Sequence, residues 1–180
     1  MSQILQRKYG MTEDRADRAN SRMTELAAGV GLEYHLDRVQ AGNTFDAHRL
    51  IHLAATRGRG DAMKERLLAA YFTEGQSIGD SAVLAQLAVE VGLDSSEAET
   101  TLLSDAFASE VRLDESRAIS LGVRGVPFFG FDESIRVSGA QPADVLVGAL
   151  ERAWSDSHPI TLVNDEGEDE EACAGGACSL

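Results

Sequence analysis

A glycine-flanked Val-Pro dipeptide that leads into an aromatic run constrains this chain more than any other feature of its sequence. The run is Gly122-Val123-Arg124-Gly125-Val126-Pro127-Phe128-Phe129. Gly122 suits the left-handed position that ends a helix, and Pro127, which has no N–H to donate, suits the first position of a strand. X-Pro bonds are also the common place for cis peptides. The segment predicts a helix end, a turn through Gly125 and then a β-strand.

The chain on either side of this loop predicts a mostly helical protein with one hairpin. Apolar residues recur at helical spacing in segments separated by glycines and capping residues. Thr12 carries a hydroxyl that can cap a helix, and either Asp80 or Ser81 can cap another, so a helix is expected to begin at each of these places. Ile135 and Val137 predict a strand that returns after a turn at 132–133. The expected helices cover residues 12–31, 43–58, 61–72, 80–92, 94–107, a segment ending at 121, and 142–153, the last with Val145, Leu146, Ala149, Leu150 and Ala153 buried.

Several motifs occur in the order in which one known family carries them. They are Asn43-Thr44-Phe45-Asp46-Ala47-His48-Arg49-Leu50, Ala70-Tyr71-Phe72-Thr73-Glu74-Gly75, and the loop with its continuation to Val137-Ser138-Gly139-Ala140-Gln141-Pro142. Over residues 9–154 the chain closely resembles the FrnE-type DsbA-like oxidoreductases, relatives of the 2-hydroxychromene-2-carboxylate isomerases. The resemblance implies an α+β, mostly helical chain with an incomplete thioredoxin-like fold, made of a C-terminal ββα part and a DsbA-type helical insertion.

The sequence contains no Cys-x-x-Cys, which in this family begins a helix after the first strand. The resemblance therefore implies that residues 1–155 form an N-terminally truncated domain, with the helical insertion at about 10–121 and the ββα part at 122–155. A misassigned start codon, a truncated sequence or a gene remnant would each account for this. Residues 156–180 are expected to be a disordered acidic tail with a Cys-x4-Cys pair, because the acids at 165–171 repel one another.

The resemblance assigns substrate binding to Val126 and Pro127. In thioredoxin-like proteins a cis-proline loop faces the redox cysteines, and the backbone of the residue before the proline pairs with an extended peptide or with glutathione. By this likeness Val126 would present its N–H and C=O to a thiol or disulfide substrate, while Phe128 and Phe129 belong to the core. Gly130 departs from the family, since a larger β-former would pack better in a strand.

Cys173 and Cys178 are the only cysteines of the chain. Two glycines between them allow the backbone to fold back far enough for a disulfide, and the resemblance implies an auxiliary catalytic redox pair. Glu170 and Glu171 lie close in sequence and disfavour the thiolate, which raises the pKa of a neighbouring thiol. The pair is therefore expected to be a weak catalyst by itself, and a soft-metal site or an inert flexible tail are the alternatives.

His48 and His52 lie four residues apart on an expected helix and so share a face. With Cys173 and Cys178 they would complete a set of four zinc ligands. No glutamate lies between them as in His-Glu-x-x-His, and the family carries the His48 motif without implying metal. We interpret both histidines as packing or capping residues and expect neither metal nor cofactor, with glutathione as a potential co-substrate.

Charge and hydropathy limit the partners of the chain. A net charge of −14 disfavours nucleic acid and anionic membranes, since both attract basic patches. No apolar run reaches the roughly 18 residues of a membrane span, and the N-terminal residues lack the apolar core of a signal peptide. We expect a cytoplasmic protein whose partner is a thiol- or disulfide-containing protein or peptide, or glutathione. The resemblance implies that the strand after Pro127 would lie beside the missing N-terminal strand. That edge is therefore expected to be bare, or covered by a rearranged helix or by a second copy of the chain in a homodimer, because an exposed apolar edge strand invites pairing.

Three functions fit these observations. The first is thiol–disulfide exchange or isomerisation of DsbA/FrnE type, impaired by the missing Cys-x-x-Cys. The second is the glutathione-dependent isomerase branch of the same family, which does not depend on that motif. The third is a catalytically inactive helical binding domain. Because the tail carries a cysteine pair, the sequence favours the first, a disulfide oxidoreductase.

Overall fold

The chain separates into two compact units, residues 1–121 and 122–180. The computed structural model describes residues 2–132 and 134–158. In these residues it has eight helices and a single two-stranded sheet, which confirms the predicted mostly helical fold with a small sheet. None of the described helices is both long and apolar enough to cross a membrane.

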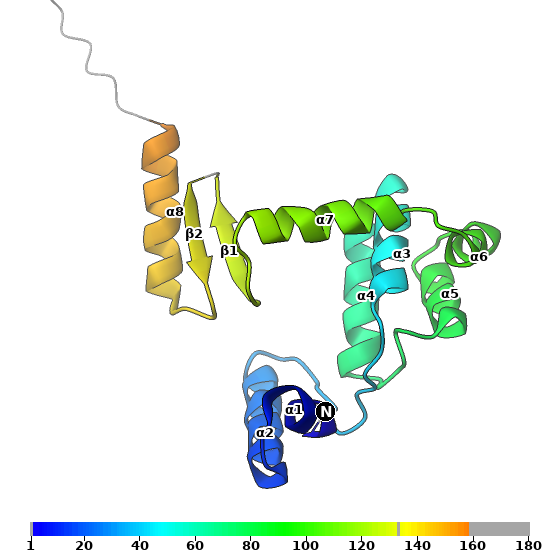
Figure 1. The fold of residues 1–180 in the computed structure, drawn as a ribbon, viewed down its shortest axis with the longest axis horizontal. Helices are drawn as coiled ribbons and strands as arrows, with labels where there is room; N and C mark the ends of the chain where they lie inside the picture. The colour runs from blue at the N-terminus through cyan, green and yellow to red at the C-terminus, as the bar shows by residue number, and fades with distance from the viewer. Residues whose placement is uncertain (1, 133, 159–180) are drawn as a thin grey trace, which may run out of the picture. The chain divides into compact units, whose positions relative to one another are not determined.

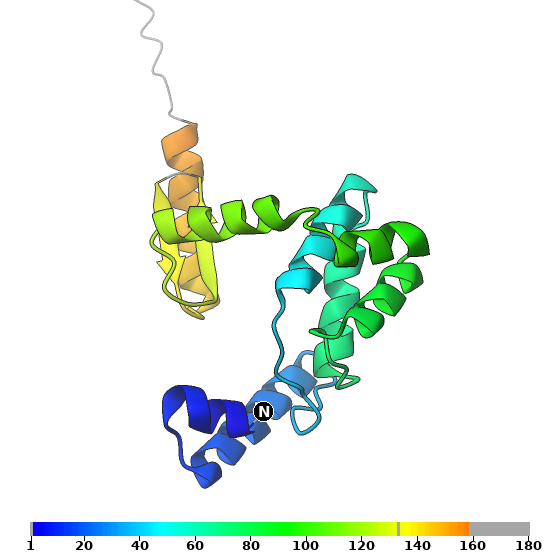
Figure 2. The same cartoon turned by 45° about the vertical axis from the view of Figure 1, so that its right-hand side comes forward.

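The first unit is entirely helical in its regular structure (Figure 1). Helices α3 and α4 pack side by side, as two views of the ribbon show (Figures 1 and 2), and α5, α6 and α7 all pack against α3. The first helix was missed by the sequence analysis, because it is short and carries no capping signal. The helices are α1 (Ser2–Tyr9), α2 (Glu13–Gly29), α3 (Phe45–Thr56), α4 (Gly60–Phe72), α5 (Ser81–Glu90), α6 (Ser95–Leu103) and α7 (Ala108–Ser120).

The core of this unit lies between α3, α4, α5 and α6. Its largest fully buried side chains are Leu50, Met63, Leu84 and Leu87. Leu84 and Leu87 are three residues apart on α5, and Leu50 and Leu53 repeat that spacing on α3, so each helix turns one apolar face inward. Burial of this face stabilises each helix far more than intrinsic helix propensity does.

Two helix starts that look alike in sequence differ in the structure. The Oδ1 atom of Asp80 accepts hydrogen bonds from the backbone N–H groups of Ala82 and Val83, at 2.8 and 3.1 Å. The side chain of Thr12, at the equivalent position of α2, makes no capping hydrogen bond. The prediction that Thr12 caps its helix through its hydroxyl is therefore wrong, although the helix begins at the next residue.

This difference gives a matched pair of variants. Asp80→Ala is expected to lower the free energy of unfolding by about 1 kcal/mol, because two N–H groups in the first turn of α5 lose their acceptor. Thr12→Ala should leave it unchanged within about 0.5 kcal/mol. Urea unfolding followed by far-ultraviolet circular dichroism measures both. Equal losses in the two variants would contradict the assignment of the cap to Asp80.

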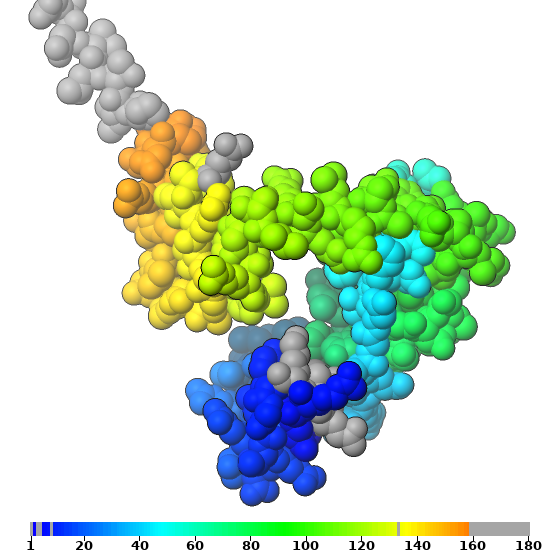
Figure 3. Space-filling model, in the orientation of Figure 1, coloured from blue at the N-terminus to red at the C-terminus, as the bar shows by residue number. Residues whose placement is uncertain are grey.

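The second unit is a β-hairpin with one helix packed on it. Strand β1 (Phe128–Phe131) pairs in antiparallel fashion with β2 (Ile135–Ser138), and Phe129 lies opposite Val137 in the register. Helix α8 (Ala143–Ser157) contacts both strands, and the space-filling view shows it and the strands as one continuous surface (Figure 3). Of the predicted apolar stripe of α8, Ala153 is buried, whereas Val145 and Leu150 are exposed. The sheet has only two strands, so it is too narrow to cover the whole apolar face of α8, and the residues at the sides of that face stay exposed.

Candidate functional site

The loop that joins α7 to β1 follows the course that its glycines and proline predict. Gly122 has a φ of +80° and follows the last turn of α7, where the N–H of Leu121 donates to the carbonyl of Arg117 at 3.0 Å. The peptide bond between Val126 and Pro127 is cis. Strand β1 begins at the next residue, Phe128. The sequence thus places Pro127, which has no N–H to donate, directly before the strand.

The hydrogen-bond pattern of the hairpin determines which backbone N–H and C=O groups of β1 bond to β2. The N–H of Gly139 donates to the carbonyl of Pro127 at 2.9 Å. Since bonded and non-bonded positions alternate along an antiparallel pair, Phe129 and Phe131 exchange hydrogen bonds with β2. Phe128 and Gly130 therefore direct their N–H and C=O groups to the opposite side of β1. In the described part of the chain no strand pairs with that side.

Val126 stands at the beginning of this open edge. Its side chain is 89% exposed, which is high for a large apolar residue. Phe128 and Phe129, which the sequence analysis assigned to the core, are half-buried. The loop therefore offers an extended, apolar and accessible segment whose backbone can accept another strand.

The predicted redox pair cannot be placed against this loop. Cys173 and Cys178 both lie outside the described residues. Their assignment as a catalytic couple therefore stays a prediction from the sequence.

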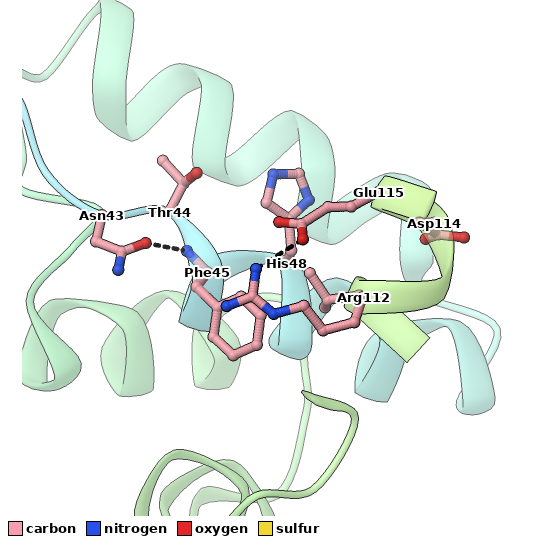
Figure 4. Close-up of a pocket in the computed structure, with 8 residues that line it drawn as sticks. Asn43, Thr44, Phe45, His48, Arg112, Asp114 and Glu115 are labelled. Carbon is pink, nitrogen blue, oxygen red and sulfur yellow. Dashed lines mark hydrogen bonds and ion pairs between the residues drawn. The ribbon is translucent and has the colours of Figure 1, made fainter. Parts of the chain in front are cut away.

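A separate concavity lies within the first unit, between the N-terminus of α3 and α7. We call it the α3–α7 pocket, a cavity of about 320 Å³. Figure 4 shows the guanidinium of Arg112 over the ring of Phe45, 4.4 Å from its centroid, and bonded to Glu115 at 2.6 Å. Asn43 accepts a hydrogen bond from the N–H of Phe45 at 3.0 Å. The residues that line the pocket are Asn43, Thr44, Phe45, His48, Val111, Arg112, Asp114 and Glu115.

The two histidines of α3 have different surroundings. His48 is exposed and lines the α3–α7 pocket. The Nε2 atom of His52 lies 3.0 Å from the Oδ2 atom of Asp114 on α7, and the ring of His52 stacks at 6.5 Å on Phe107. Over residues 2–132 and 134–158, no three histidine, cysteine or acidic side chains are grouped as a metal site would need. Through its contacts with Asp114 and Phe107, His52 joins α3 to α7 and to the residue before it.

Arg49 makes four side-chain hydrogen bonds within the helical unit that no local pattern of the sequence predicts. It is only 4% exposed. Its Nε atom donates to the carbonyl of Ala106 at 2.8 Å, and its Nη1 atom donates to Asp46 at 2.8 Å. Its Nη2 atom donates to the carbonyls of Thr101 and Ser104. These partners lie more than fifty residues away except for Asp46, so the sequence carried no local signal for them.

The shifted pKa values belong to a second structural network, which joins α4 to α5. Arg66 donates to Glu90 at 2.5 Å and to Glu74 at 2.9 Å. Burial by itself would lower the pKa of Arg66, but the hydrogen bonds and charges of these two carboxylates together raise it. The hydrogen bond from Arg66, with a second from Gln86, lowers the pKa of Glu90. Burial raises the pKa of Tyr71. The hydrogen bonds of Arg66 to Glu90 and Glu74 thus join α4 to α5 and to the segment after α4.

In this chain a helix, a cis X-Pro loop, an antiparallel hairpin and a final helix packed on one face of the hairpin follow one another. This order of elements is typical of the C-terminal part of thioredoxin-like domains. The long helical segment ahead of that loop is what a helical insertion into such a domain would provide. Sequence and structure comparisons agree with this classification.

The family model of the DSBA-like thioredoxin domain matches residues 4–151. The fold is similar to the crystal structure of the probable DsbA oxidoreductase SCO1869 from Streptomyces coelicolor, with a TM-score of 0.82 and 39% sequence identity. That match covers 98% of this chain and 76% of the other. The uncharacterized protein YwbO of Bacillus subtilis is 29% identical over 127 residues, which are 69% of this chain and 63% of that relative. The chain thus spans less than two thirds of this curated relative, and it belongs to the DSBA-like thioredoxin domain family.

Proposed function

We propose that the chain takes part in thiol–disulfide exchange of the FrnE type. In this proposal an extended peptide, or glutathione, pairs with the open edge of β1 from Val126 onward, and Cys173 and Cys178 supply the thiols. One observation carries the proposal. Val126 is 89% exposed directly before Pro127, and strand β1 begins at the next residue, so the backbone of Val126 is placed to meet an extended substrate. The likeness to the probable DsbA oxidoreductase supports it.

The chemistry needs both cysteines and an external thiol. The thiolate of one cysteine attacks a substrate disulfide, which forms a mixed disulfide and releases one substrate sulfur as a thiolate that takes up a proton. The second cysteine then attacks the mixed disulfide and frees the substrate in its dithiol form. Two electrons have passed to the substrate, and Cys173 and Cys178 are joined as a disulfide. Two molecules of a low-molecular-weight thiol such as glutathione then return the pair to the reduced state by the same two steps and leave as their own disulfide.

The cysteine pair favours this function over the isomerase branch of the family. An isomerase that uses glutathione would bind the peptide backbone of glutathione at the same edge. It would not need a pair of cysteines of its own, such as Cys173 and Cys178. Acidic residues 165–171 precede the pair. Because negative charge close to a thiol disfavours the thiolate, exchange is expected to be slow at neutral pH.

Backbone amide resonances test where the substrate binds. A short extended peptide with one disulfide, added to the ¹⁵N-labelled chain, is expected to shift the amides of Val126, Phe128 and Gly130. The amides of Arg136 and Ser138 lie at the non-bonded positions of β2 and point away from β1, so they serve as the internal control. Shifts confined to other regions, or equal shifts at both edges of the hairpin, would contradict binding at Val126.

A further inference from the structure

A small cavity lies in the helical unit, between the segment that follows α2 and the C-terminal half of α4. We call it the Tyr34 pocket, and its volume is about 260 Å³. The rings of Tyr34 and Phe72 both line it and stack on each other, with centroids 4.6 Å apart and planes at 14°. Tyr71 contacts Phe72 edge-on, with centroids 4.9 Å apart. The wall of the pocket is therefore largely aromatic.

Hydrogen bonds hold the two walls of the Tyr34 pocket together. The N–H of His35 donates to the carbonyl of Phe72 at 2.7 Å. The hydroxyl of Thr73 donates to the carbonyl of Glu33 at 2.7 Å. Both walls belong to the first unit. The pocket is thus formed before any ligand arrives, which lowers the entropic cost of binding.

The charge in the Tyr34 pocket is negative. Glu33 and Glu65 line it, and there is no lysine or arginine among the described residues that form its walls. The Oε1 atom of Glu33 lies 2.8 Å from the Nε2 atom of His35, whereas the carboxylate of Glu65 has no hydrogen bond or ion pair to another described residue. Leu32 and Leu68 add apolar surface, and each is 51% exposed. A cation on an apolar stem matches this combination of rings, carboxylates and apolar side chains.

We propose that the Tyr34 pocket binds an arginine side chain of a basic partner polypeptide. Arginine lays a planar guanidinium on an aromatic ring and donates from the same plane to a carboxylate, which an ammonium group cannot do. The chain itself contains this arrangement, since the guanidinium of Arg112 lies 4.4 Å from the centroid of Phe45 and donates to Glu115 at 2.6 Å. The volume of about 260 Å³ falls below the roughly 300–1,000 Å³ of small-molecule sites. One side chain therefore suits the pocket better than a whole cofactor.

A second concavity beside the pocket favours an extended polypeptide over a free amine. Tyr34 lines this concavity as well, together with residues of α2 and of the segment 35–37. Its acidic side chains are Asp17, Glu25 and Asp37, and the described residues around it include no lysine or arginine. Residues next to the bound arginine therefore meet further carboxylates, so we expect basic neighbours in the partner. Because these carboxylates are exposed, added salt weakens the binding.

Titration of the ¹⁵N-labelled whole chain with a sulfur-free peptide, acetyl-Ala-Arg-Arg-Ala-amide, tests this proposal. The amides of Tyr34, Leu68 and Thr73 are expected to shift, and the shifts give the dissociation constant. A peptide with citrulline in place of arginine keeps the shape without the charge and should bind about tenfold more weakly. A lysine peptide should bind about threefold more weakly. Equal binding of the citrulline peptide, or shifts confined to other regions, overturns the proposal, and equal binding of the lysine peptide overturns the choice of arginine.

Two glutamine variants separate the pocket from general attraction between a basic peptide and an acidic protein. Glu65→Gln is expected to raise the dissociation constant about two- to fivefold, as the loss of one exposed ion pair does. Glu99→Gln makes the same change of charge on α6, at a residue that lines neither concavity, and should leave the constant unchanged. Both side chains are exposed, so both variants are expected to keep the fold. Equal weakening in the two variants, or none in Glu65→Gln, contradicts the proposal.

This inference goes beyond the proposed function. The peptide contains no sulfur, so its binding is measured whether or not Cys173 and Cys178 exchange disulfides. Failure of the peptide to bind leaves thiol exchange untouched, and inactive cysteines leave the binding of the peptide unchanged.

Discussion

Replacing Arg49 with alanine is expected to lower the free energy of unfolding of the helical unit by about 3–5 kcal/mol. The guanidinium is almost fully buried and donates to Asp46 and to the carbonyls of Thr101, Ser104 and Ala106. Those carbonyls belong to the end of α6 and the segment that leads into α7. Alanine removes their shared donor, and each buried oxygen left without a partner costs free energy. Urea unfolding followed by circular dichroism measures the loss.

The same measurement on Arg112→Ala provides the control. Arg112 is exposed, and its guanidinium contacts Phe45 and bonds to Glu115 at the surface. Exposed ion pairs of this kind contribute between zero and about 1 kcal/mol. Arg49→Lys should recover little, because an ammonium group cannot reproduce the planar fork that reaches several acceptors. A loss for Arg49→Ala no larger than that for Arg112→Ala would contradict the role assigned to Arg49.

Replacing both tail cysteines with serine is expected to abolish any thiol–disulfide exchange that the chain performs. Cys173 and Cys178 are the only thiols in the sequence, and serine is not a nucleophile for disulfides under these conditions. Turbidity in an insulin-reduction assay, driven by excess glutathione or dithiothreitol, measures the rate against the uncatalysed background. Each single substitution should leave a chain that forms mixed disulfides but does not release them by intramolecular attack.

Two controls keep this test specific. The double variant should unfold at the same urea concentration as the unsubstituted chain, since the sequence predicts that both cysteines belong to an acidic tail outside the folded domain. Exchange should also be slower at pH 6 than at pH 8, because the thiolate is the attacking species. Insulin reduction that persists above background in the double variant would exclude the tail pair as the source of activity.

The local chemistry of the chain predicted most of its elements correctly. Asp80 marks the start of a helix through its capping side chain, and Gly92 and Gly122 mark helix ends through their left-handed backbone. In the structure α5 begins directly after Asp80 and ends shortly before Gly92, and α7 ends shortly before Gly122. Ile135 and Val137 predicted the return strand β2, which the structure has at Ile135–Ser138. These signals depend on a few neighbouring residues, so one sequence is enough to read them. Thr12 is the exception, since a helix formed there without the expected side-chain hydrogen bond.

The sites depend on the sequence to different degrees. The exposed Val126 before Pro127 was identified from the sequence, because the proline and its flanking glycines determine the backbone there. The α3–α7 pocket was not, because its two walls are separated by more than fifty residues in the sequence. Nor was the exposure of Leu150. Helical spacing predicts which residues lie on the apolar face of α8. It does not predict how wide the sheet beneath that face is, and the width decides whether Leu150 is covered.

The sequence by itself determined the family, the helical character of the chain, and the loop that carries Pro127, because short-range backbone preferences and ordered motifs encode them. Only the tertiary structure decided the register in which β1 pairs with β2, where the four hydrogen bonds of Arg49 end, and that His52 meets Asp114. Those results follow from packing between segments far apart in the chain. The free energy of such contacts depends on all the partners at once, and no local pattern records it.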